Sequence, residues 1–542
     1  MSLHHQPIGE IPEDTARIAR AAFRKGNTIM RLRDEFGTLY TDADFAQLFP
    51  TRGRSALAPW RLALITVFQF LENLTDRQAA DQVRARIDWK YALGLELADA
   101  GFDFSVLSEF RTRLVQGQAE HLLLDKMLTH FKAQGLVKAK GKQRTDSTHV
   151  LAHVRGLNHL ELVAETLRAA LNELASEAPE WVRGIAEPEW FERYGRPVFD
   201  FRLPKGQAAR DAYATMVGDD GSRLLAALEA ENAPTTLREL PCVQTLRLIW
   251  IQHYERRDGG ARLRDGPELP PSAARPISPY EREARGSTKR GLWWVGYKAH
   301  LTETCDEHEV HLITQVLTTP AMVQDVSFTA DIQSALVNQG LAPQQHLVDS
   351  GYVDAGLFAE SLTRGIELIG PPRPNTSWQT KVEGAFDDRA FSIDWEAQQV
   401  TCPQGQTSWR WYDTPDRCNR PAITVHFDPK TCMACPVRSR CTRAKKGARV
   451  LKLHPQETHE ALRAVQTGGL GKVYRLRAGI EGTIAQGRRR CGLRRARYRG
   501  LVKTHLQHVI TAVALNAARV TAWLADIPHA TTPTSRFLAL KA

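Results

Sequence analysis

The sequence predicts an α/β fold, in which a mixed sheet of five strands with flanking helices follows an all-helical N-terminal region and carries two insertions. Three observations support this prediction. Apolar residues recur at helical spacing through residues 59–74, as in an amphipathic or buried helix. They alternate with polar residues through 293–302, which is the period of a strand. Two short apolar runs, 346–352 and 366–370, end at glycine or proline, as buried strands often do.

The positive charge of the chain is concentrated in one segment. The 542 residues carry a net charge of +11. Between residues 438 and 503 alone, 19 lysines and arginines face three glutamates, which leaves a local net charge of +16. A block of this kind indicates a contact surface for a polyanion, with nucleic acid as the first candidate.

The sequence also argues against a membrane protein and against a fold stabilised by disulfides. The chain has no run of eighteen apolar residues, and its N-terminus lacks the apolar core of a signal peptide;. Eight cysteines in 542 residues are too few for a disulfide scaffold;. We therefore expect a cytoplasmic protein without a membrane partner.

Residues 1–140 are predicted to be helical. Thr75, with Gln78 three residues later, forms a capping-box pattern that starts a second helix soon after 59–74;. This pair is typical of a helix-turn-helix, but a plain helical hairpin fits the pattern equally well. A third helix is expected to start with Ser105 as its cap, and a fourth to end at Gly135.

The remaining elements are predicted in a fixed order. They are a strand at 144–150, a helical insertion at about 156–288 that ends in a connector rich in proline, glycine and arginine, a hairpin of strands at 293–302 and 310–317, a helix at 322–338, a strand at 346–352, a helix at 354–364, a strand at 366–370, a Cys-rich insertion at about 372–470, and two final helices, of which the second covers 506–524.

Three acids stand out in this order. Asp146 lies in the first strand, Asp349 ends a later strand, and Glu481 is on a helix after the sheet. Asp349 alone is equally well read as a turn or cap residue. Sheets of this strand order place the first and fourth strands side by side, with a late helix across them, in the RNase H-like arrangement. That arrangement would bring the three acids together.

Glu481 is the one carboxylate among nine arginines between Tyr474 and Arg499. At 100° per residue, Tyr474, Arg477, Glu481 and Arg488 share one face of a helix, provided that the helix runs past Gly487. Such a face suits a metal ion with a phosphate chain across it. The alternative is a simple ion pair between Arg477 and Glu481 four residues apart.

These motifs resemble those of the DDE-class transposases of bacterial insertion sequences. Asp146 in TDST and Asp349 in HLVDSGY match the first two acids of the family, and the Tyr474–Arg477–Glu481–Arg488 spacing matches its Tyr-x2-Arg-x3-Glu-x6-Lys/Arg signature. GYKAHLTETCD, CPVRSRCT and CGLRRARYRG are similar to one subgroup. The resemblance implies a helical DNA-binding domain over 1–140, a catalytic domain over 141–525 and a short tail over 526–542.

The resemblance also implies the chemistry. Two Mg²⁺ or Mn²⁺ ions would be held by Asp146, which bridges both ions, by Asp349 and by Glu481. Cleavage would free the 3′ ends of the element, which would then attack target DNA. The partners would be terminal inverted repeats, target DNA and a second copy of the chain, at the nucleoid. The residues expected to contact DNA are Tyr474, Arg477, Arg488, Arg489, Arg490, Arg494, Arg495, Arg497, Lys298 and His300.

Some of these assignments have ordinary structural alternatives. Lys298 and His300 lie on the polar face of the strand at 293–302, which is also explained by solvation of that face;. Trp293 and Trp294 suit stacking on an unpaired base, but packing in a core or at its rim is the more common role of tryptophan.

Four cysteines in the second insertion have the spacing of a metal site. Cys402, Cys432, Cys435 and Cys441 form C-x29-C-x2-C-x5-C. Four thiolates suit a structural Zn²⁺, with an iron–sulfur cluster or free thiols as alternatives. Cys418 competes for the fourth position.

Two other functions remain open at the level of sequence. One is an RNase H-like nuclease or resolvase, which cuts DNA without joining it. The other is a catalytically inactive DNA-binding regulator derived from a transposase.

Overall fold

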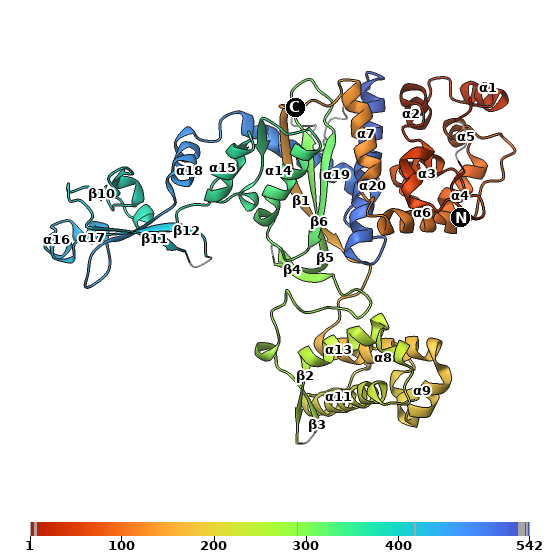
Figure 1. Ribbon diagram of the computed structural model, residues 1–542, viewed down its shortest axis with the longest axis horizontal. Helices are drawn as coiled ribbons and strands as arrows, with labels where there is room; N and C mark the ends of the chain where they lie inside the picture. Colours follow the sequence, from red (N-terminus) through yellow and green to blue (C-terminus); the bar gives the residue numbers. More distant parts are fainter. Residues whose placement is uncertain are drawn as a thin grey trace.

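The computed structural model describes residues 2–4, 8–258, 260–289, 291–416 and 419–528, together with 537 and 540. Cys418 and most of the predicted tail lie outside these residues. Figure 1 shows four parts: N-terminal helices, a central sheet with flanking helices, a helical insertion and a Cys-rich lobe that extends away from the sheet. The mixed α/β architecture with a helical N-terminal part is the predicted one.

The N-terminal part consists of helices, as the sequence predicted. They are α1 (Glu13–Ala22), α2 (Thr28–Phe36), α3 (Pro59–Leu71), α4 (Asp76–Ala85), α5 (Ile87–Leu93), α6 (Ser105–Gln116) and α7 (Leu122–Ala133). The capping box of Thr75 and Gln78 at the start of α4 is confirmed. Ser105 does not cap α6 with its side chain. Instead, the backbone N–H of Ser105 donates a hydrogen bond to the Asp103 carboxylate.

The central sheet has the strand order β6-β5-β1-β7-β8, with β4 as a further strand. The strands are β1 (Lys142–Leu151), β4 (Arg285–Lys289), β5 (Leu292–Thr304), β6 (Ile313–Pro320), β7 (Gln345–Leu347) and β8 (Glu367–Ile369). β1 pairs antiparallel with β5 and parallel with β7. The first and fourth predicted strands are therefore neighbours, as in the RNase H-like arrangement.

Strand β4 is the strand of the central sheet that the sequence did not reveal. It lies in the connector rich in proline and glycine and pairs antiparallel with Leu292–Gly296, the first residues of β5. A short edge strand has few side chains to bury, so its hydrophobic period is weak.

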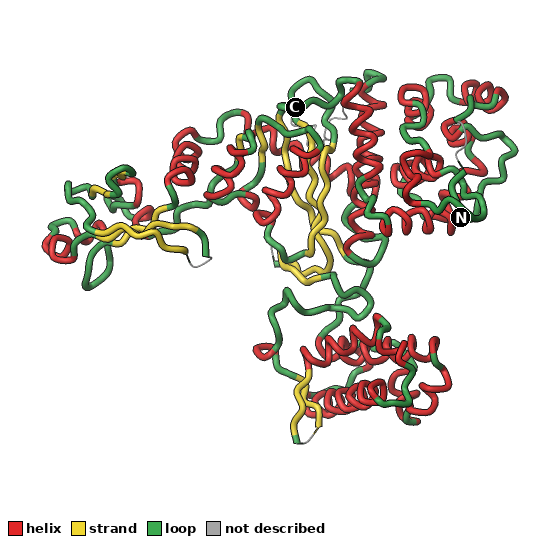
Figure 2. The backbone as a smooth tube through the Cα atoms, in the orientation of Figure 1, coloured by secondary structure: helices red, strands yellow, loops and turns green. Residues whose placement is uncertain are grey.

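Helices cover the sheet on both sides (Figure 2). They are α14 (Thr329–Asn338), α15 (Ala355–Thr363), α18 (Gln456–Gly468), α19 (Ile480–Cys491) and α20 (Leu501–Trp523). Buried side chains of α20, of the sheet and of the N-terminal helices form one continuous hydrophobic core. The residues before and after the predicted boundary at 140 therefore share one hydrophobic core. None of the described helices has the length and apolar character needed to cross a membrane.

The helical insertion has a hydrophobic core of its own. It contains α8 (His159–Glu177), α9 (Pro179–Ile185), α10 (Pro188–Tyr194), α11 (Gln207–Glu229), α12 (Thr235–Arg238), α13 (Pro241–His253), β2 (Tyr254–Arg257) and β3 (Gly260–Leu263). The Cys-rich lobe (residues 386–455) contains β9 (Ser392–Asp394), β10 (Gln399–Thr401), β11 (Arg410–Pro415), β12 (Pro421–His426), β13 (Val450–Leu453), α16 (Pro429–Ala434) and α17 (Arg438–Cys441).

Two histidines, the half-buried His505 and the buried His508, join α20 to its neighbours. The Nε2 atom of His505 lies 2.9 Å from Nε2 of His121, just before α7. Nδ1 of His508 lies 2.7 Å from Oγ1 of Thr318 on β6. Burial, reinforced by the neighbouring histidines, lowers the pKa of His505 and of His508 to about 3.

We expect these histidines to make stability fall with acidification. Their folded pKa lies below the value of about 6.5 in the unfolded chain, so the unfolded state takes up protons first as the pH drops below 6.5. Each such histidine should cost about 1.4 kcal/mol per pH unit in that window. Urea unfolding between pH 7.5 and 5 measures the slope. His508→Gln should make it shallower, whereas His130→Gln, at an exposed position, should not; equal slopes in all three proteins would contradict the prediction.

Candidate active site

Asp146 lies within β1, where the pairing with β5 buries most of its side chain. The carboxylate is 14% exposed. Its Oδ2 accepts a hydrogen bond from Nη2 of Arg477 at 2.8 Å, and its Oδ1 accepts one from the backbone N–H of Ser147 at 2.7 Å. Burial raises the pKa of Asp146 to about 6, against the opposing effect of Arg477. A carboxylate with a raised pKa in this setting is a candidate functional group.

Asp349 follows β7, the parallel neighbour of β1. It caps a short 3-10 helix, Ser350–Tyr352, and accepts the backbone N–H of Gly351 at 2.8 Å. The cap role that the sequence suggested is thus present. The same side chain also places Oδ2 3.6 Å from Nη2 of Arg477, so the cap orients the carboxylate toward the Asp146 site.

Glu481 lies in the first turn of α19, and its side chain is 69% exposed. Its Oε1 is 3.5 Å from Nη1 of Arg477. The ion pair between residues 477 and 481 is therefore present, but it is part of a larger cluster. One guanidinium faces the three carboxylates that come from β1, from the end of β7 and from α19.

The segment around Glu481 differs from the single helix expected from its spacing. Residues Val473–Gly479 form a 3-10 helix, and α19 begins only at Ile480. A 3-10 helix advances about 120° per residue instead of 100°. Tyr474 and Arg477 therefore do not share with Glu481 the single α-helical face that the sequence predicted. Helix α19 does run through Gly487 and ends at Gly492, whose φ of 66° is left-handed. Arg488 therefore shares a helix with Glu481 and lies two turns after it.

A buried ion network fixes the start of α19 to the sheet. Glu303 on β5 is fully buried and receives hydrogen bonds from Arg144 of β1, Thr483 of α19 and Arg519 of α20, at 2.8, 2.6 and 2.8 Å. Burial would raise the pKa of Glu303, but Arg519 and Arg144 outweigh it and hold that pKa below its ordinary value. The network ties together elements that carry Asp146 and Glu481.

Gly479 is part of the same arrangement. The Arg144 guanidinium lies against it, so that a Cβ at Gly479 would be 2.1 Å from Nη1 of Arg144. Only glycine leaves room for this approach without a shift of the buried arginine. A glycine at this position therefore has a packing reason.

Asp325 is a fourth carboxylate near the site, and no sequence signal singled it out. Its Oδ2 accepts a hydrogen bond from Oγ of Ser147 at 2.9 Å, and its Oδ1 pairs with Nζ of Lys298 at 2.7 Å. Lys298 also donates to the Val323 carbonyl. Asp325 falls inside the helix that the sequence predicted over 322–338, whereas the structure has a 3-10 helix there, Asp325–Phe328, before α14.

His300 is the clearest correction among the residues expected to contact DNA. It is 1% exposed and lies 2.6 Å from the hydroxyl of Tyr352 and 3.0 Å from that of Thr319. The polar face of β5 is covered, so direct contact with DNA is excluded for His300. Lys298 forms an ion pair with Asp325. Tyr474 is half-buried and packs against a small hydrophobic cluster that includes Leu347.

The arginines after Glu481 fall into two groups. Arg490 donates to the Leu71 carbonyl, and Arg497 donates to the Leu74 carbonyl and stacks over the Phe70 ring, so both contact the N-terminal helices. Arg494 donates to the Thr148 hydroxyl at 2.8 Å. The second group, Arg488, Arg489 and Arg495, is exposed; Arg490 is also exposed despite its contact with Leu71, as is Arg499. Of the two tryptophans, Trp293 is 60% exposed and Trp294 is buried.

The three acids offer hard oxygen ligands of the kind that Mg²⁺ and Mn²⁺ prefer. As the side chains stand, no group of three or more histidine, cysteine, aspartate or glutamate residues in the described part of the chain is arranged to hold a metal ion. The positive charge among Asp146, Asp349 and Glu481 is supplied by Arg477. The donor chemistry fits a divalent ion once that guanidinium moves.

Comparison with known protein families gives two matches. Residues 401–521 match a transposase DDE domain, a range that contains Glu481, α19 and most of α20. Residues 20–113 match a transposase domain (DUF772), which covers most of the N-terminal helices. No curated protein matches the chain. With the strand order of its core, these two matches support an insertion-sequence DDE transposase.

Proposed function

We propose that this transposase binds the terminal inverted repeats of its element and carries out DNA cleavage and strand transfer through Asp146, Asp349 and Glu481. The observation that supports this proposal is the meeting of the three acids, from distant parts of the chain, around Arg477. Carboxylates that converge without a cation would repel one another. Their convergence on a guanidinium favours a site built for cations.

Transposases of the DDE class use divalent metal ions. We propose two Mg²⁺ or Mn²⁺ ions, with Asp146 as the shared ligand, Asp349 as a ligand of one ion and Glu481 as a ligand of the other. Bound there, they would stabilise negative charge on the attacking and leaving oxygens of the phosphodiester. Asp146 is anchored by the sheet and Asp349 by its cap, whereas the exposed Glu481 can adjust to the substrate.

Arg477 would then change partners during the reaction. While it faces the carboxylates, it neutralises them. When cations replace it, its guanidinium is free to hold a phosphate next to the scissile bond, for which its planar donor set is suited. This exchange gives the predicted phosphate contact of Arg477 a physical basis.

The DNA itself is proposed to follow the exposed arginines beyond Glu481. Arg488 and Arg489 at the end of α19, together with Arg495, add positive charge close to the acids without internal partners of the kind that Arg490 and Arg497 have. Pairing of two transposon ends requires two active sites, so we propose a homodimer in the synaptic complex, at work on DNA of the nucleoid.

A strand-transfer assay tests the proposed function. The purified protein, Mg²⁺, labelled DNA carrying the terminal inverted repeat and a supercoiled target plasmid are incubated together. We expect labelled 3′ ends joined to the plasmid, and no joining with a scrambled end. Cleavage without joining would instead favour a nuclease or resolvase, and binding without cleavage a regulator.

A further inference from the structure

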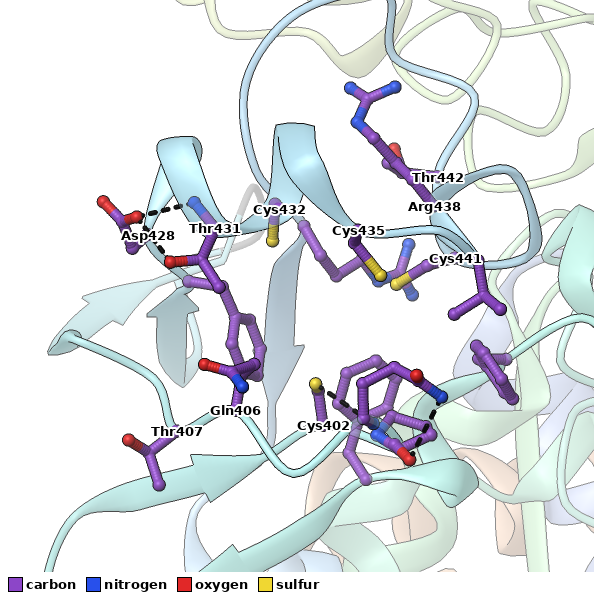
Figure 3. Close-up of a pocket in the computed structure, with 17 residues that line it drawn as sticks. Cys402, Gln406, Thr407, Asp428, Thr431, Cys432, Cys435, Arg438, Cys441 and Thr442 are labelled. Atoms are coloured by element: carbon purple, nitrogen blue, oxygen red, sulfur yellow. Dashed lines mark hydrogen bonds between the residues drawn. The ribbon is translucent and has the colours of Figure 1, made fainter.

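Four cysteines of the Cys-rich lobe line one pocket although they come from three separate segments. Cys402 follows β10, Cys432 and Cys435 lie in and just after α16, and Cys441 ends α17. The pocket has a volume of about 70 Å³. Figure 3 shows the four sulfur atoms turned toward this space, with Cys402 on one wall and the other three on the opposite wall.

The backbone around Cys402 has the form of a metal-binding knuckle. The N–H of Gln404 donates to the Sγ atom of Cys402 at 3.4 Å. The chain then turns at Gly405, whose φ is 75° and whose N–H donates to the Cys402 carbonyl. The hydrogen bond and the turn together hold the Cys402 sulfur in place at the wall of the pocket.

The opposite wall is also held in place by the chain. Asp428 caps α16 by accepting the N–H and the hydroxyl of Thr431 at 2.8 Å each, which fixes the helix that carries Cys432. The N–H of Cys435 donates to the Cys432 carbonyl at 3.4 Å. The two-residue spacing therefore forms a tight turn with both sulfurs toward the pocket (Figure 3).

The lobe has little else to stabilise it. Its described core consists of seven buried hydrophobic residues, five of them on strands of three to six residues. Cores of this size seldom suffice without a disulfide or a metal. The described cysteines are all free, and a cytoplasmic transposase would keep them reduced.

We propose that Cys402, Cys432, Cys435 and Cys441 bind one Zn²⁺ ion as four thiolates. As the side chains stand, the four cysteines are not arranged to hold a metal ion, so binding of the ion draws the turn after β10 toward α16 and α17 and holds together the two walls of the lobe. Four thiolate donors favour tetrahedral Zn²⁺ over Mg²⁺ or Mn²⁺. This site is therefore chemically distinct from the carboxylate site and does not depend on the proposed strand-transfer chemistry.

Zinc analysis of the full-length protein, purified without added metal, tests the site. We expect about one Zn²⁺ per chain by mass spectrometry, in line with a structural thiolate site. Cys402→Ser and Cys435→Ser should each lower the zinc content to less than a fifth, while Cys242→Ser in α13, away from the lobe, should leave it unchanged. Less than half an equivalent of zinc in the wild-type protein, iron in place of zinc, or full zinc in the Cys435→Ser protein would overturn the proposal.

Titration of the wild-type protein with a mercurial thiol reagent avoids dependence on the folding of variants. Zinc release, followed with a chromogenic chelator, should track modification of the lobe cysteines. Hydrogen exchange should then rise in β11–β13 and remain low in β1 and β5. Release of no zinc, or equal exchange in the lobe before and after release, would count against the proposed site.

Discussion

Replacement of Glu481 by glutamine is expected to lower strand transfer by at least about a hundredfold while leaving the fold intact. Loss of a residue that only orients a metal ligand commonly costs 10- to 100-fold, so removal of a direct ligand charge should cost at least about the upper value. The Glu481 side chain is 69% exposed, and it pairs with Arg477 at 3.5 Å. An exposed, isosteric change of this kind should alter the free energy of unfolding by less than about 0.5 kcal/mol.

The matched control for this variant is Glu457→Gln. Glu457 is an exposed glutamate of α18, so its replacement removes the same charge outside the cluster around Arg477. Activity should remain at the wild-type level in Glu457→Gln, and binding to inverted-repeat DNA should be the same in both variants. Full strand transfer by Glu481→Gln at saturating Mg²⁺ would rule out Glu481 as a metal ligand.

Much of the sheet could be predicted because its signals are local. Alternation through β5, the short apolar runs of β7 and β8, and the capping box at Thr75 depend on neighbouring residues alone. Strand β4 could not be found in this way, because it is short, polar and stabilised by pairing with the start of β5. Pairing of this kind depends on tertiary context rather than on the sequence of the strand.

The acids of the candidate site were predictable, but their surroundings were not. Asp146, Asp349 and Glu481 could be chosen from strand order and resemblance. The polar face of β5 suggested contact with solvent or DNA for His300, whereas the structure buries it against Tyr352 and Phe328. The 3-10 turn that carries Arg477 also has no distinct sequence period, because it depends on packing against Arg144 and Leu347.

Glu303 is the residue whose replacement should most damage the structure around the site. In Glu303→Gln the two arginines that flank it, Arg144 and Arg519, keep their charges at side-chain exposures of 6% and 11% but lose the carboxylate between them. Removal of one partner from a buried ion network typically costs about 3–5 kcal/mol. We therefore expect a loss of that size in the free energy of unfolding, measured by urea denaturation.

The matched control for charge removal is Glu309→Gln. Glu309 pairs with Lys138 at 2.6 Å, but the two side chains are 35% and 64% exposed, so the loss should stay below about 1 kcal/mol. Equal losses in the two variants would show that the burial of the Glu303 network is not what stabilises this region.

A second measurement separates general destabilisation from an effect on the position of Glu481. The Glu303 carboxylate accepts the hydroxyl of Thr483, two residues after Glu481, and Arg144 donates to the Leu476 carbonyl just before Arg477. Hydrogen exchange under native conditions should therefore rise more in residues 473–491 than in α3 of the N-terminal part. A uniform rise would mean that Glu303 supports the fold as a whole, whereas a local rise with reduced strand transfer would mean that the buried network holds the third acid in reach of the other two.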